Sequence, residues 1–388
     1  MNVLRTEYLD KLTRFKGRTD IVKVITGIRR CGKSTLLMQF KDILKAEGVD
    51  DKDIIYMNFE SFQNERFLDR RTLTEYLLNT GAGRKYLLLD EIQRVKEWEL
   101  MINSILVDMD ADVYITGSNA YFLSTDLSTY LTGRSVTIDM LPLSFSEFSE
   151  LNGNDDIIEY LNMGGMPMIG RNMRYEDAQD VLNNINSTIL LNDVVTRNNI
   201  RNVSSLTKIL EYIYSEIGNL ISSNSIAKQL EISDKTADEH LRMLEESLLI
   251  IKVPRYDMKG GKILKGQCKY YATDTGMRNA FLRSRDRDIG RLVENTVFLE
   301  LKRKGYRVTV GKYGDNEIDF TASKDQVTEY YQVTKTVVDS AVLEREIRPL
   351  EDLKDNYSKT VITLDTPPQN NINGIRFMKL KDFLSLAL

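Results

Sequence analysis

The chain has 388 residues, which is enough for two or three domains with cores of their own. A formal net charge of −4 gives no general attraction to nucleic acid or to anionic membranes, so either contact would need a local basic patch. Two cysteines exclude a disulfide framework and favour a reducing compartment. Neither a membrane-spanning apolar run nor the apolar core of a secretion signal is found, so we expect a soluble, cytoplasmic protein without membrane contact.

Short apolar runs alternate with helical patterns between Ile21 and Ile138. The runs "IVKVIT", "DIIYMNFE", "KYLLLDE", "DVYITGS" and "RSVTID" are typical of buried strands. This alternation predicts an α/β domain with a parallel sheet covered by helices on both faces. Ligands of such sheets bind at the carboxyl ends of the strands, and the unusual residues of this chain fall there.

The segment "GIRRCGKST" fits the phosphate-loop pattern G-x-x-x-x-G-K-[ST], with a strand before it and a helix after it. Its glycines let successive backbone N–H groups face phosphate oxygens at a helix N-terminus. We expect Lys33 to reach the terminal phosphates of ATP and the Ser34 hydroxyl to bind Mg²⁺. The predicted nucleotide-binding residues are Gly27, Ile28, Arg29, Arg30, Cys31, Gly32, Lys33, Ser34 and Thr35.

The buried run "YLLLDE" ends in two carboxylates, Asp90 and Glu91. Asp90 is expected to hold Mg²⁺ through water, and Glu91 to orient and deprotonate the water that attacks ATP. The alternative is a structural acidic pair, because acids favour the first turn of a helix. A protein that only binds nucleotide would not need Glu91, so this residue favours hydrolysis.

Polar residues also follow the next strand, in "VYITGSNA". Thr116, Ser118 or Asn119 could sense the γ-phosphate or position water, although strand ends are often polar because turns follow them. Asn119 enters our set of catalytic candidates, but the sequence does not decide among the three. Arg134 in "LTGRSV" is a candidate to stabilise transition-state charge, in cis or from a neighbouring chain, and a plain surface arginine is the alternative.

Past Asp139 the pattern becomes helical. A tight junction at "MGGMPMIG" marks a helical lid or linker, and residues 203–256 look like a winged helix, with three helices and then a hairpin. The third helix, "SDKTADEHLRMLEESLL", has more acidic residues than its Lys235 and Arg242 can balance. It therefore predicts weak DNA binding at best, and a protein-packing role is equally compatible with it.

The last hundred residues follow a helix–strand–strand–strand–helix–strand order that resembles the restriction-endonuclease-like fold. By that resemblance Glu294, Asp319 and Gln332 occupy the site positions. The fold requires an acid and a lysine two residues apart, because such residues share one face of a strand. Here the pair is neutral Gln332 and Thr334, Lys335 is expected on the opposite face, and an amide is a poor Mg²⁺ ligand. We expect no nuclease activity.

Taken together, the chain resembles a prokaryotic family of AAA-type ATPases in which a P-loop domain precedes a C-terminal domain of unknown function. The resemblance rests on "GIRRCGKSTLL", "LLLDEIQ", "ITGSNA", "EYLNMGGMP", "KYYATDTGMRNA", "NEIDF" and "YYQVT" in this order. It implies ATP binding and ATPase activity. The expected organisation is a P-loop domain (1–140), a helical lid or linker (141–202), a winged-helix part (203–275) and an endonuclease-like part (276–388).

Three functions compete at this stage. The first is a Mg²⁺-dependent ATPase that moves or regulates its C-terminal part. The others are a regulator that binds DNA or protein and uses ATP as a switch, and an ATP-gated nuclease, which Gln332 and Thr334 disfavour. The pathway, the partner and the oligomeric state stay open.

Overall fold

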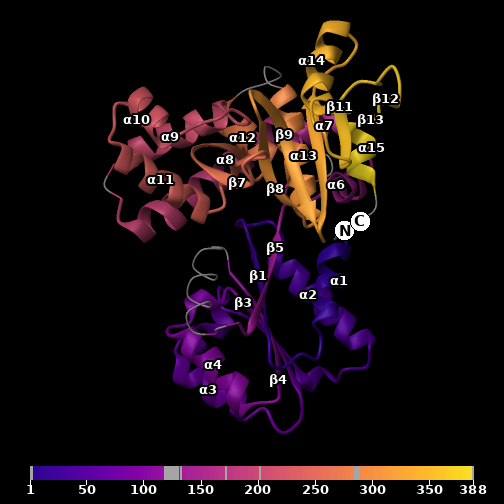
Figure 1. Cartoon of the computed structure of the whole chain (residues 1–388). Helices are drawn as coiled ribbons and strands as arrows, with labels where there is room; N and C mark the ends of the chain where they lie inside the picture. Colours follow the sequence, from indigo (N-terminus) through magenta and orange to yellow (C-terminus); the bar gives the residue numbers. More distant parts are fainter. Residues whose placement is uncertain are drawn as a thin grey trace. The chain divides into compact units, whose positions relative to one another are not determined.

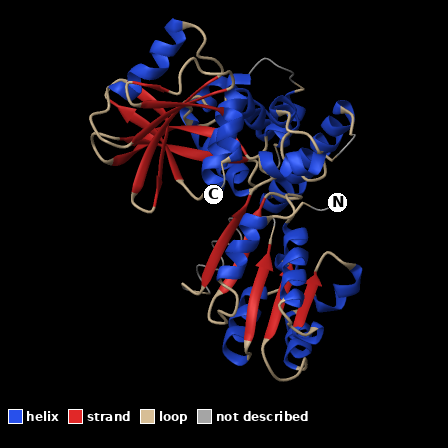
Figure 2. Ribbon diagram, turned by 90° about the vertical axis from the view of Figure 1, so that its right-hand side faces the viewer, coloured by secondary structure: helices blue, strands red, loops and turns tan. Residues whose placement is uncertain are grey.

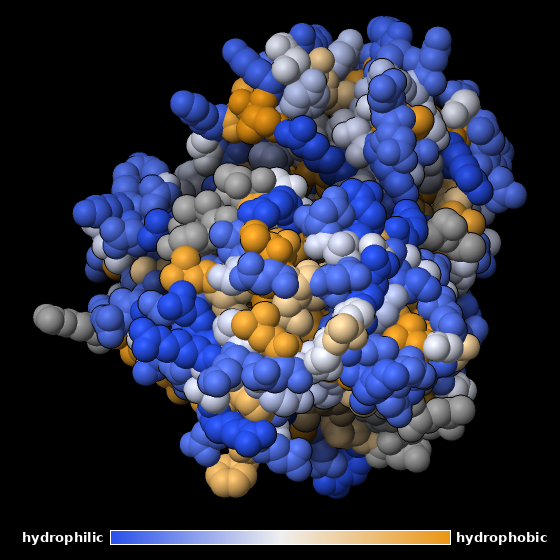
Figure 3. Space-filling view, turned by 90° about the horizontal axis from the view of Figure 1, so that it is seen from below, coloured by the Kyte–Doolittle hydropathy of each residue, from blue (hydrophilic) through white to orange (hydrophobic). Residues whose placement is uncertain are grey.

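The computed structural model describes residues 3–117, 131, 133–170, 173–200, 202–283 and 289–386. The chain forms two compact units, Met1–Leu141 with Glu246–Leu248, and Pro142–Glu245 with Leu249–Leu388 (Figures 1 and 2). Within the described ranges, no helix has the length and apolar character needed to cross a membrane. The face drawn in Figure 3 is mainly hydrophilic, and its apolar side chains gather in small separate groups.

The first unit is built on a five-stranded parallel sheet of order β2-β3-β4-β1-β5. This arrangement confirms the α/β fold predicted from the alternating pattern. Figure 1 shows α1 and α2 on one side of the sheet and α3 and α4 on the other. The strands are β1 (Val22–Gly27), β2 (Ile54–Asn58), β3 (Lys85–Asp90), β4 (Ala111–Thr116) and β5 (Ser135–Met140), and the helices are α1 (Thr6–Arg14), α2 (Lys33–Ala46), α3 (Arg70–Leu78) and α4 (Trp98–Asp108).

Along each buried strand, successive side chains pack alternately against the helices on one face of the sheet and those on the other. Leu87 and Leu89 of β3 belong to the core that contains Leu73 of α3 and Trp98 of α4. On the other face, Tyr114 of β4 packs its ring 4.7 Å from that of Phe40 in α2. Because both faces are covered, every residue of β1 and β4 is buried, and the two charged residues among them, Lys23 and Asp112, pair with each other.

The second unit combines helices with an eight-stranded mixed sheet of order β12-β13-β11-β10-β9-β8-β6-β7. Its helices are α6 (Phe145–Asn152), α7 (Ile157–Met163), α8 (Tyr175–Thr188), the π-helix η4 (Ile189–Thr196), α9 (Val203–Ser215), α10 (Ser223–Leu230), α11 (Asp234–Glu246), α12 (Thr275–Leu282), α13 (Ile289–Arg303), α14 (Ser340–Glu351) and α15 (Leu380–Ser385). Its strands are β6 (Ile250–Asp257), β7 (Lys262–Ala272), β8 (Arg307–Tyr313), β9 (Asn316–Lys324), β10 (Val327–Thr334), β11 (Ser358–Thr363), β12 (Asn371–Ile372) and β13 (Ile375–Lys379).

The hairpin β6–β7 belongs to this same sheet. It follows the three helices α9 to α11, where the sequence analysis expected a separate wing. Strand β6 pairs in parallel with β8, from Arg255 opposite Val310 to Asp257 opposite Lys312. The hairpin and the endonuclease-like strands β8 to β11 therefore share one sheet, and side chains of β7 can reach the positions that the endonuclease resemblance singled out.

Two glycine-containing motifs of the family resemblance interlock in this unit. A Cβ on Gly164, in "MGGMP", would lie 2.1 Å from Oδ1 of Asp274, and a Cβ on Gly276 would lie 1.9 Å from the carbonyl oxygen of Met163. The Gly165 N–H donates to Oδ2 of Asp274 at 2.6 Å. Burial raises the pKa of Asp274 to about 6. Close backbone packing thus accounts for these glycines.

Candidate active site

The phosphate loop, residues 27–35, joins β1 to α2 as the sequence predicted. A Cβ on Gly27 would lie 2.4 Å from the carbonyl oxygen of Met140 and 2.8 Å from Sγ of Cys31, so no other residue fits there without displacement. Gly32, the residue before α2, has a φ of 106°, in the left-handed region that favours glycine. The two glycines of the motif are therefore required by the backbone path of the loop.

Lys33 is buried at the start of α2. Its Nζ donates to the carbonyl oxygens of Gly27 at 3.0 Å and Ile28 at 3.2 Å. These neutral acceptors hold the ammonium beside the loop. The phosphate of a nucleotide carries full negative charge, so it would compete strongly with them for the same ammonium.

Arg5, which the sequence analysis missed, is buried and contacts the phosphate loop. Its Nη1 donates to the carbonyl oxygen of Cys31 at 3.1 Å, and its Nη2 donates to that of Leu141 at 2.8 Å. The guanidinium thereby fixes one carbonyl of the phosphate loop to the segment after β5. No local pattern around Arg5 marks it, because both contacts are distant in sequence.

Asp90 is fully buried at the end of β3, and neutral groups hold both of its carboxylate oxygens. Oδ1 accepts a hydrogen bond from Oγ1 of Thr116 at 2.6 Å. Oδ2 accepts from Nδ2 of Asn58 at 2.8 Å and from the hydroxyl of Tyr56 at 3.2 Å. Burial, together with the charge of Asp90, raises the pKa of Tyr56 to about 12, so this phenol stays a donor. These bonds orient the carboxylate without supplying positive charge.

Glu91 has a φ of 58°, which is uncommon for a residue with a side chain and concentrates at functional sites. Its N–H donates to Oγ1 of Thr116 at 2.9 Å, and its carboxylate accepts from Nε2 of Gln93. Burial raises the pKa of Glu91, while the charge of Lys33 opposes that shift. A raised pKa suits a carboxylate that has to accept a proton near neutral pH.

The parallel register gathers most of the predicted site at one edge of the sheet. The phosphate loop, Asp90 with Glu91, and Thr116 follow the carboxyl ends of β1, β3 and β4, and β4 lies between β3 and β1. Ser34 and Thr35 lie in the first turn of α2, and Arg29 pairs with Glu60 at 3.2 Å. Ser118 and Asn119 lie outside the described residues.

The structure does not bring Arg134 to the phosphate loop of its own unit. Its carbonyl oxygen accepts from the N–H of Val22, the first residue of β1, at 2.9 Å. Its Nη2 donates to Oδ1 of Asn103 in α4 at 2.6 Å. The loop begins at the other end of β1, and five residue steps along a strand cover roughly 17 Å. Arg134 therefore lies at the edge of the sheet opposite the phosphate loop.

The available donors fit a Mg²⁺ ion that arrives with ATP. In the described parts of the chain, no group of three or more His, Cys, Asp or Glu side chains is arranged to hold a metal alone. Mg²⁺ in nucleotide sites is usually held by one or two protein oxygens together with phosphates and waters. The Ser34 hydroxyl and the Asp90 carboxylate are oxygen donors of that kind, and the hydrogen bonds on both Asp90 oxygens favour contact through water.

In the second unit, an irregularity in the sheet affects one of the positions that the endonuclease resemblance singled out, Asp319 of β9. Between Thr309 and Gly311 of β8 the partners on β9 change from Thr321 to Ile318, so β9 contains one extra residue here. Such a bulge changes the face toward which neighbouring side chains point. The bulge includes Asp319. The face of the sheet toward which this side chain points therefore cannot be predicted from the regular two-residue alternation of a strand.

Gln332 contacts one helix, whereas the Cβ of Lys335 lies near another. Gln332 accepts from the N–H of Asp319 at 3.3 Å and donates through Nε2 to Oε2 of Glu346, in α14, at 3.1 Å. The Cβ of Lys335 lies 3.9 Å from the position of a Cβ on Gly290, in α13. No lysine two residues from Gln332 faces the same side, because that position holds Thr334.

The lysine that does reach these carboxylates comes from the hairpin. Lys269 of β7 is buried, and its Nζ contacts a carboxylate cluster that consists of Glu294 at 3.0 Å, Glu317 at 3.1 Å and Asp319 at 3.2 Å. Burial disfavours the ammonium, but the three carboxylates outweigh it and raise the pKa of Lys269. The available signal was a lysine inside the apolar run "CKYYA", because buried lysines are rare unless paired.

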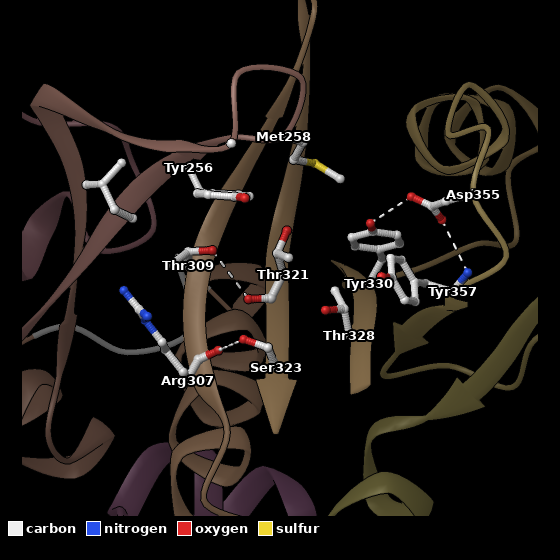
Figure 4. Close-up of a pocket in the computed structure, with 12 residues that line it drawn as sticks. Tyr256, Met258, Arg307, Thr309, Thr321, Ser323, Thr328, Tyr330, Asp355 and Tyr357 are labelled. Carbon is white, nitrogen blue, oxygen red and sulfur yellow. Dashed lines mark hydrogen bonds between the residues drawn. The ribbon is translucent and has the colours of Figure 1, made fainter. Parts of the chain in front are cut away.

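The second unit also contains a cavity of about 570 Å³ on the open face of β6, β8, β9 and β10 (Figure 4). Tyr256, Tyr330 and Tyr357 line it together with threonine and serine hydroxyls, and the Tyr330 hydroxyl donates to Oδ2 of Asp355 at 2.8 Å. None of the predicted site residues lines this cavity. This cavity is therefore not part of the candidate site at the phosphate loop.

Two family models match two successive segments of the chain. A model of the AAA domain matches residues 19–149, and a model of a domain of unknown function (DUF8612) matches residues 154–288. An uncharacterized protein of Haemophilus influenzae is 35% identical, over 98% of this chain and 98% of its own length. The uncharacterized protein MJ1544 of Methanocaldococcus jannaschii is 30% identical, over 88% of this chain and 82% of its own length. The AAA match includes the phosphate loop, Asp90, Glu91 and Thr116.

Proposed function

Because this chain belongs to a prokaryotic family in which an AAA domain precedes a domain of unknown function, we propose that it is a Mg²⁺-dependent ATPase. One observation supports hydrolysis in particular. The Thr116 hydroxyl donates to Asp90 and accepts from the N–H of Glu91, so a single side chain positions both carboxylates beside the phosphate loop. A protein that only bound ATP would not need a second, separately oriented carboxylate.

Each residue then has a defined role. The N–H groups of the phosphate loop and the Lys33 ammonium bind the phosphates. Ser34 and Asp90 would hold Mg²⁺, which supplies positive charge against the phosphate oxygens. Glu91 orients the attacking water and accepts its proton, and burial keeps the pKa of its carboxylate raised for that purpose.

Two further assignments follow from the geometry. Thr116 contacts Asp90 and Glu91 directly, which favours it as the positioning residue among the polar residues that follow β4. Arg134 could stabilise transition-state charge only from a second copy of the chain, because its own phosphate loop lies at the opposite edge of the sheet. Asn119 remains a catalytic candidate from the sequence.

The second unit is the proposed target of the nucleotide cycle, and its partner is DNA or another protein. The acidic helix α11 favours a protein partner over tight DNA binding. Nuclease activity is disfavoured because Gln332 bonds to Glu346 and the ammonium of Lys269 lies among the carboxylates of the cluster. A regulator that binds ATP as a switch, without turnover, is the second candidate.

ATP turnover by the purified chain tests the proposal. Phosphate release in Mg²⁺ should occur in the wild type and be lost in Lys33→Ala, which should bind ATP about 10- to 100-fold more weakly because a charged hydrogen bond is removed. Calorimetry with a non-hydrolysable ATP analogue separates binding from turnover. Normal nucleotide affinity in Lys33→Ala would overturn the loop assignment, and binding without any turnover, with or without DNA, would favour the switch.

A further inference from the structure

The carboxylate cluster of the second unit surrounds a cation that belongs to the chain itself. The side chain of Lys269 is 3% exposed, and its Nζ contacts one carboxylate from α13 and two from β9. The Tyr271 hydroxyl adds a hydrogen bond to Oε1 of Glu294 at 2.6 Å. Groups from α13 and β9 thus converge on the buried ammonium of Lys269 in β7.

The charges at this point do not balance. One ammonium faces three carboxylates, and a second cation, Arg255 of β6, contacts Glu317, with its Nη2 3.5 Å from Oε2. The side chains of Glu294 and Asp319 are 15% and 13% exposed, and that of Glu317 is 31% exposed. Carboxylates this close together repel one another, so the cluster favours a cation of higher charge than an ammonium. Three carboxylates from two elements are the kind of oxygen set that binds a divalent cation.

The spacing of the oxygens is that of an ammonium site. The three contacts to Nζ measure 3.0 to 3.2 Å. Ca²⁺ binds oxygen at about 2.3–2.6 Å and Mg²⁺ at about 2.0–2.1 Å, so the carboxylates would need to move inward by roughly 0.5 to 1 Å. As arranged here, these side chains do not form a group that could hold a metal ion, and no such group occurs among the described residues. Ca²⁺ needs the smaller movement and tolerates the more irregular geometry.

We propose that Lys269 is a tethered cation that fills a divalent-cation site, and that withdrawal of its ammonium opens the carboxylate cluster to Ca²⁺. Lys269 is on β7, the edge strand of the sheet, whereas the cluster is on α13 and β9. The hairpin β6–β7 therefore carries the cation that closes the site. This inference is independent of ATP hydrolysis.

An ordinary structural ion pair would behave differently. Removal of its lysine would leave unpaired, partly buried carboxylates and destabilise the fold, and added metal ions would not restore stability. A tethered substitute for a metal ion predicts that a divalent cation takes over the role of the missing ammonium. The two accounts differ in their response to metal rather than in the loss of stability.

The test uses Lys269→Met in the full chain, without nucleotide, titrated with CaCl₂. We expect about one Ca²⁺ per chain, with an affinity near 10⁻⁴ to 10⁻³ M, and a midpoint of thermal unfolding raised by roughly 5 °C at saturation. The wild type should show neither effect. Lys265→Met removes an exposed lysine of the same strand and serves as the matched control. Addition of Asp319→Asn to Lys269→Met should weaken Ca²⁺ binding at least tenfold.

A second variant, Lys269→Met with Glu317→Gln, removes one charge of each sign and guards against failure of the single variant to fold. It keeps two carboxylates and should show the same Ca²⁺ effect at lower affinity. Folded variants without a Ca²⁺ effect at 10 mM, or Ca²⁺ binding by the wild type that Asp319→Asn abolishes, would overturn the proposal. Recovery of an unfolded variant by Ca²⁺ would support it, and failure of both variants to fold in 10 mM Ca²⁺ would count against it.

Discussion

Each unit places carboxylates where chemistry was expected, fully buried at Asp90 and partly exposed in the carboxylate cluster, and the two units surround them differently. In the first unit, the donors to Asp90 are the hydroxyls of Thr116 and Tyr56 and the amide of Asn58. In the second, the carboxylate cluster contacts the ammonium of Lys269. Neutral donors fix the position of a carboxylate but leave its charge to be balanced from outside, whereas an ammonium supplies part of the balancing charge itself.

This difference separates a site that can take a metal ion with its substrate from one that is already filled. Under the proposed function, the first unit receives positive charge as Mg²⁺ bound to ATP. The second unit has the acidic residues of an endonuclease-like fold, but its cation is covalently part of the chain. The number of acidic residues in the sequence would therefore predict metal binding equally at both sites, although the two sites differ in whether a cation already occupies them.

The largest effect should come from Glu91→Gln, which removes the proposed base and keeps the side-chain shape. Turnover of ATP should fall about 10²- to 10⁴-fold while ATP stays bound, because positioned bases contribute that much. Steady-state phosphate release and nucleotide affinity should be measured together. Glu97→Gln is the matched control, because Glu97 also has a positive φ, of 54°, but is exposed. Equal turnover in Glu91→Gln and the wild type would make Asp90 and Glu91 a structural pair.

Thr116→Val tests whether neutral donors organise the first site. Loss of a hydroxyl that orients a metal-binding group typically costs about 10- to 100-fold in metal affinity or activity, and we expect turnover to fall by that factor. Thr116→Ser retains the hydroxyl and should keep most of the activity. If Val and Ser behave alike, the hydrogen bonds of Thr116 do not position Asp90 and Glu91.

Gln332→Glu combined with Thr334→Lys restores the acid-and-lysine spacing on β10 and tests the second site. We expect neither metal binding nor DNA cleavage, because the ammonium of Lys269 still fills the carboxylate cluster. The new carboxylate would also face Glu346, whose Oε2 lies 3.1 Å from Nε2 of Gln332, and should lower the free energy of unfolding by about 1–3 kcal/mol. Urea denaturation and a plasmid-nicking assay measure the two results. Metal-dependent cleavage would show that Lys269 does not close the site.

Asp274 offers a third case, a buried carboxylate held by backbone N–H groups. Burial raises its pKa to about 6, above the ordinary value of 3.8, so the folded state binds this proton more tightly than the unfolded state. Its stabilising contribution is therefore complete below about pH 4 and is lost as the pH rises through 6. The Asp274→Asn variant has no titrating group at this position and does not lose this contribution. Between pH 4 and pH 7, its free energy of unfolding should therefore rise relative to that of the wild type by on the order of 1 kcal/mol. A pH-independent difference in urea denaturation would contradict this.

The sequence predicted what depends on local pattern. Alternating apolar runs identified the strands of the first unit, and the phosphate-loop spacing placed Lys33 at a helix start. Contacts between distant segments were beyond such reasoning. The pairing of β6 with β8, which carries Lys269 into the carboxylate cluster, leaves no periodic signal, and the extra residue of β9 at Asp319 breaks the alternation on which strand arguments depend. For the same reason, Arg5 was missed and Arg134 was left ambiguous.

The number of divalent cations bound per chain tests the central comparison most directly. Mn²⁺, which electron paramagnetic resonance can count, should be titrated into Glu91→Gln with and without ATP. The account predicts no tightly bound Mn²⁺ without nucleotide and one with ATP, with the latter lost on Lys33→Ala and unchanged on Asp319→Asn. Mn²⁺ that binds without ATP and disappears on Asp319→Asn would contradict it, as would the absence of bound Mn²⁺ when ATP is present.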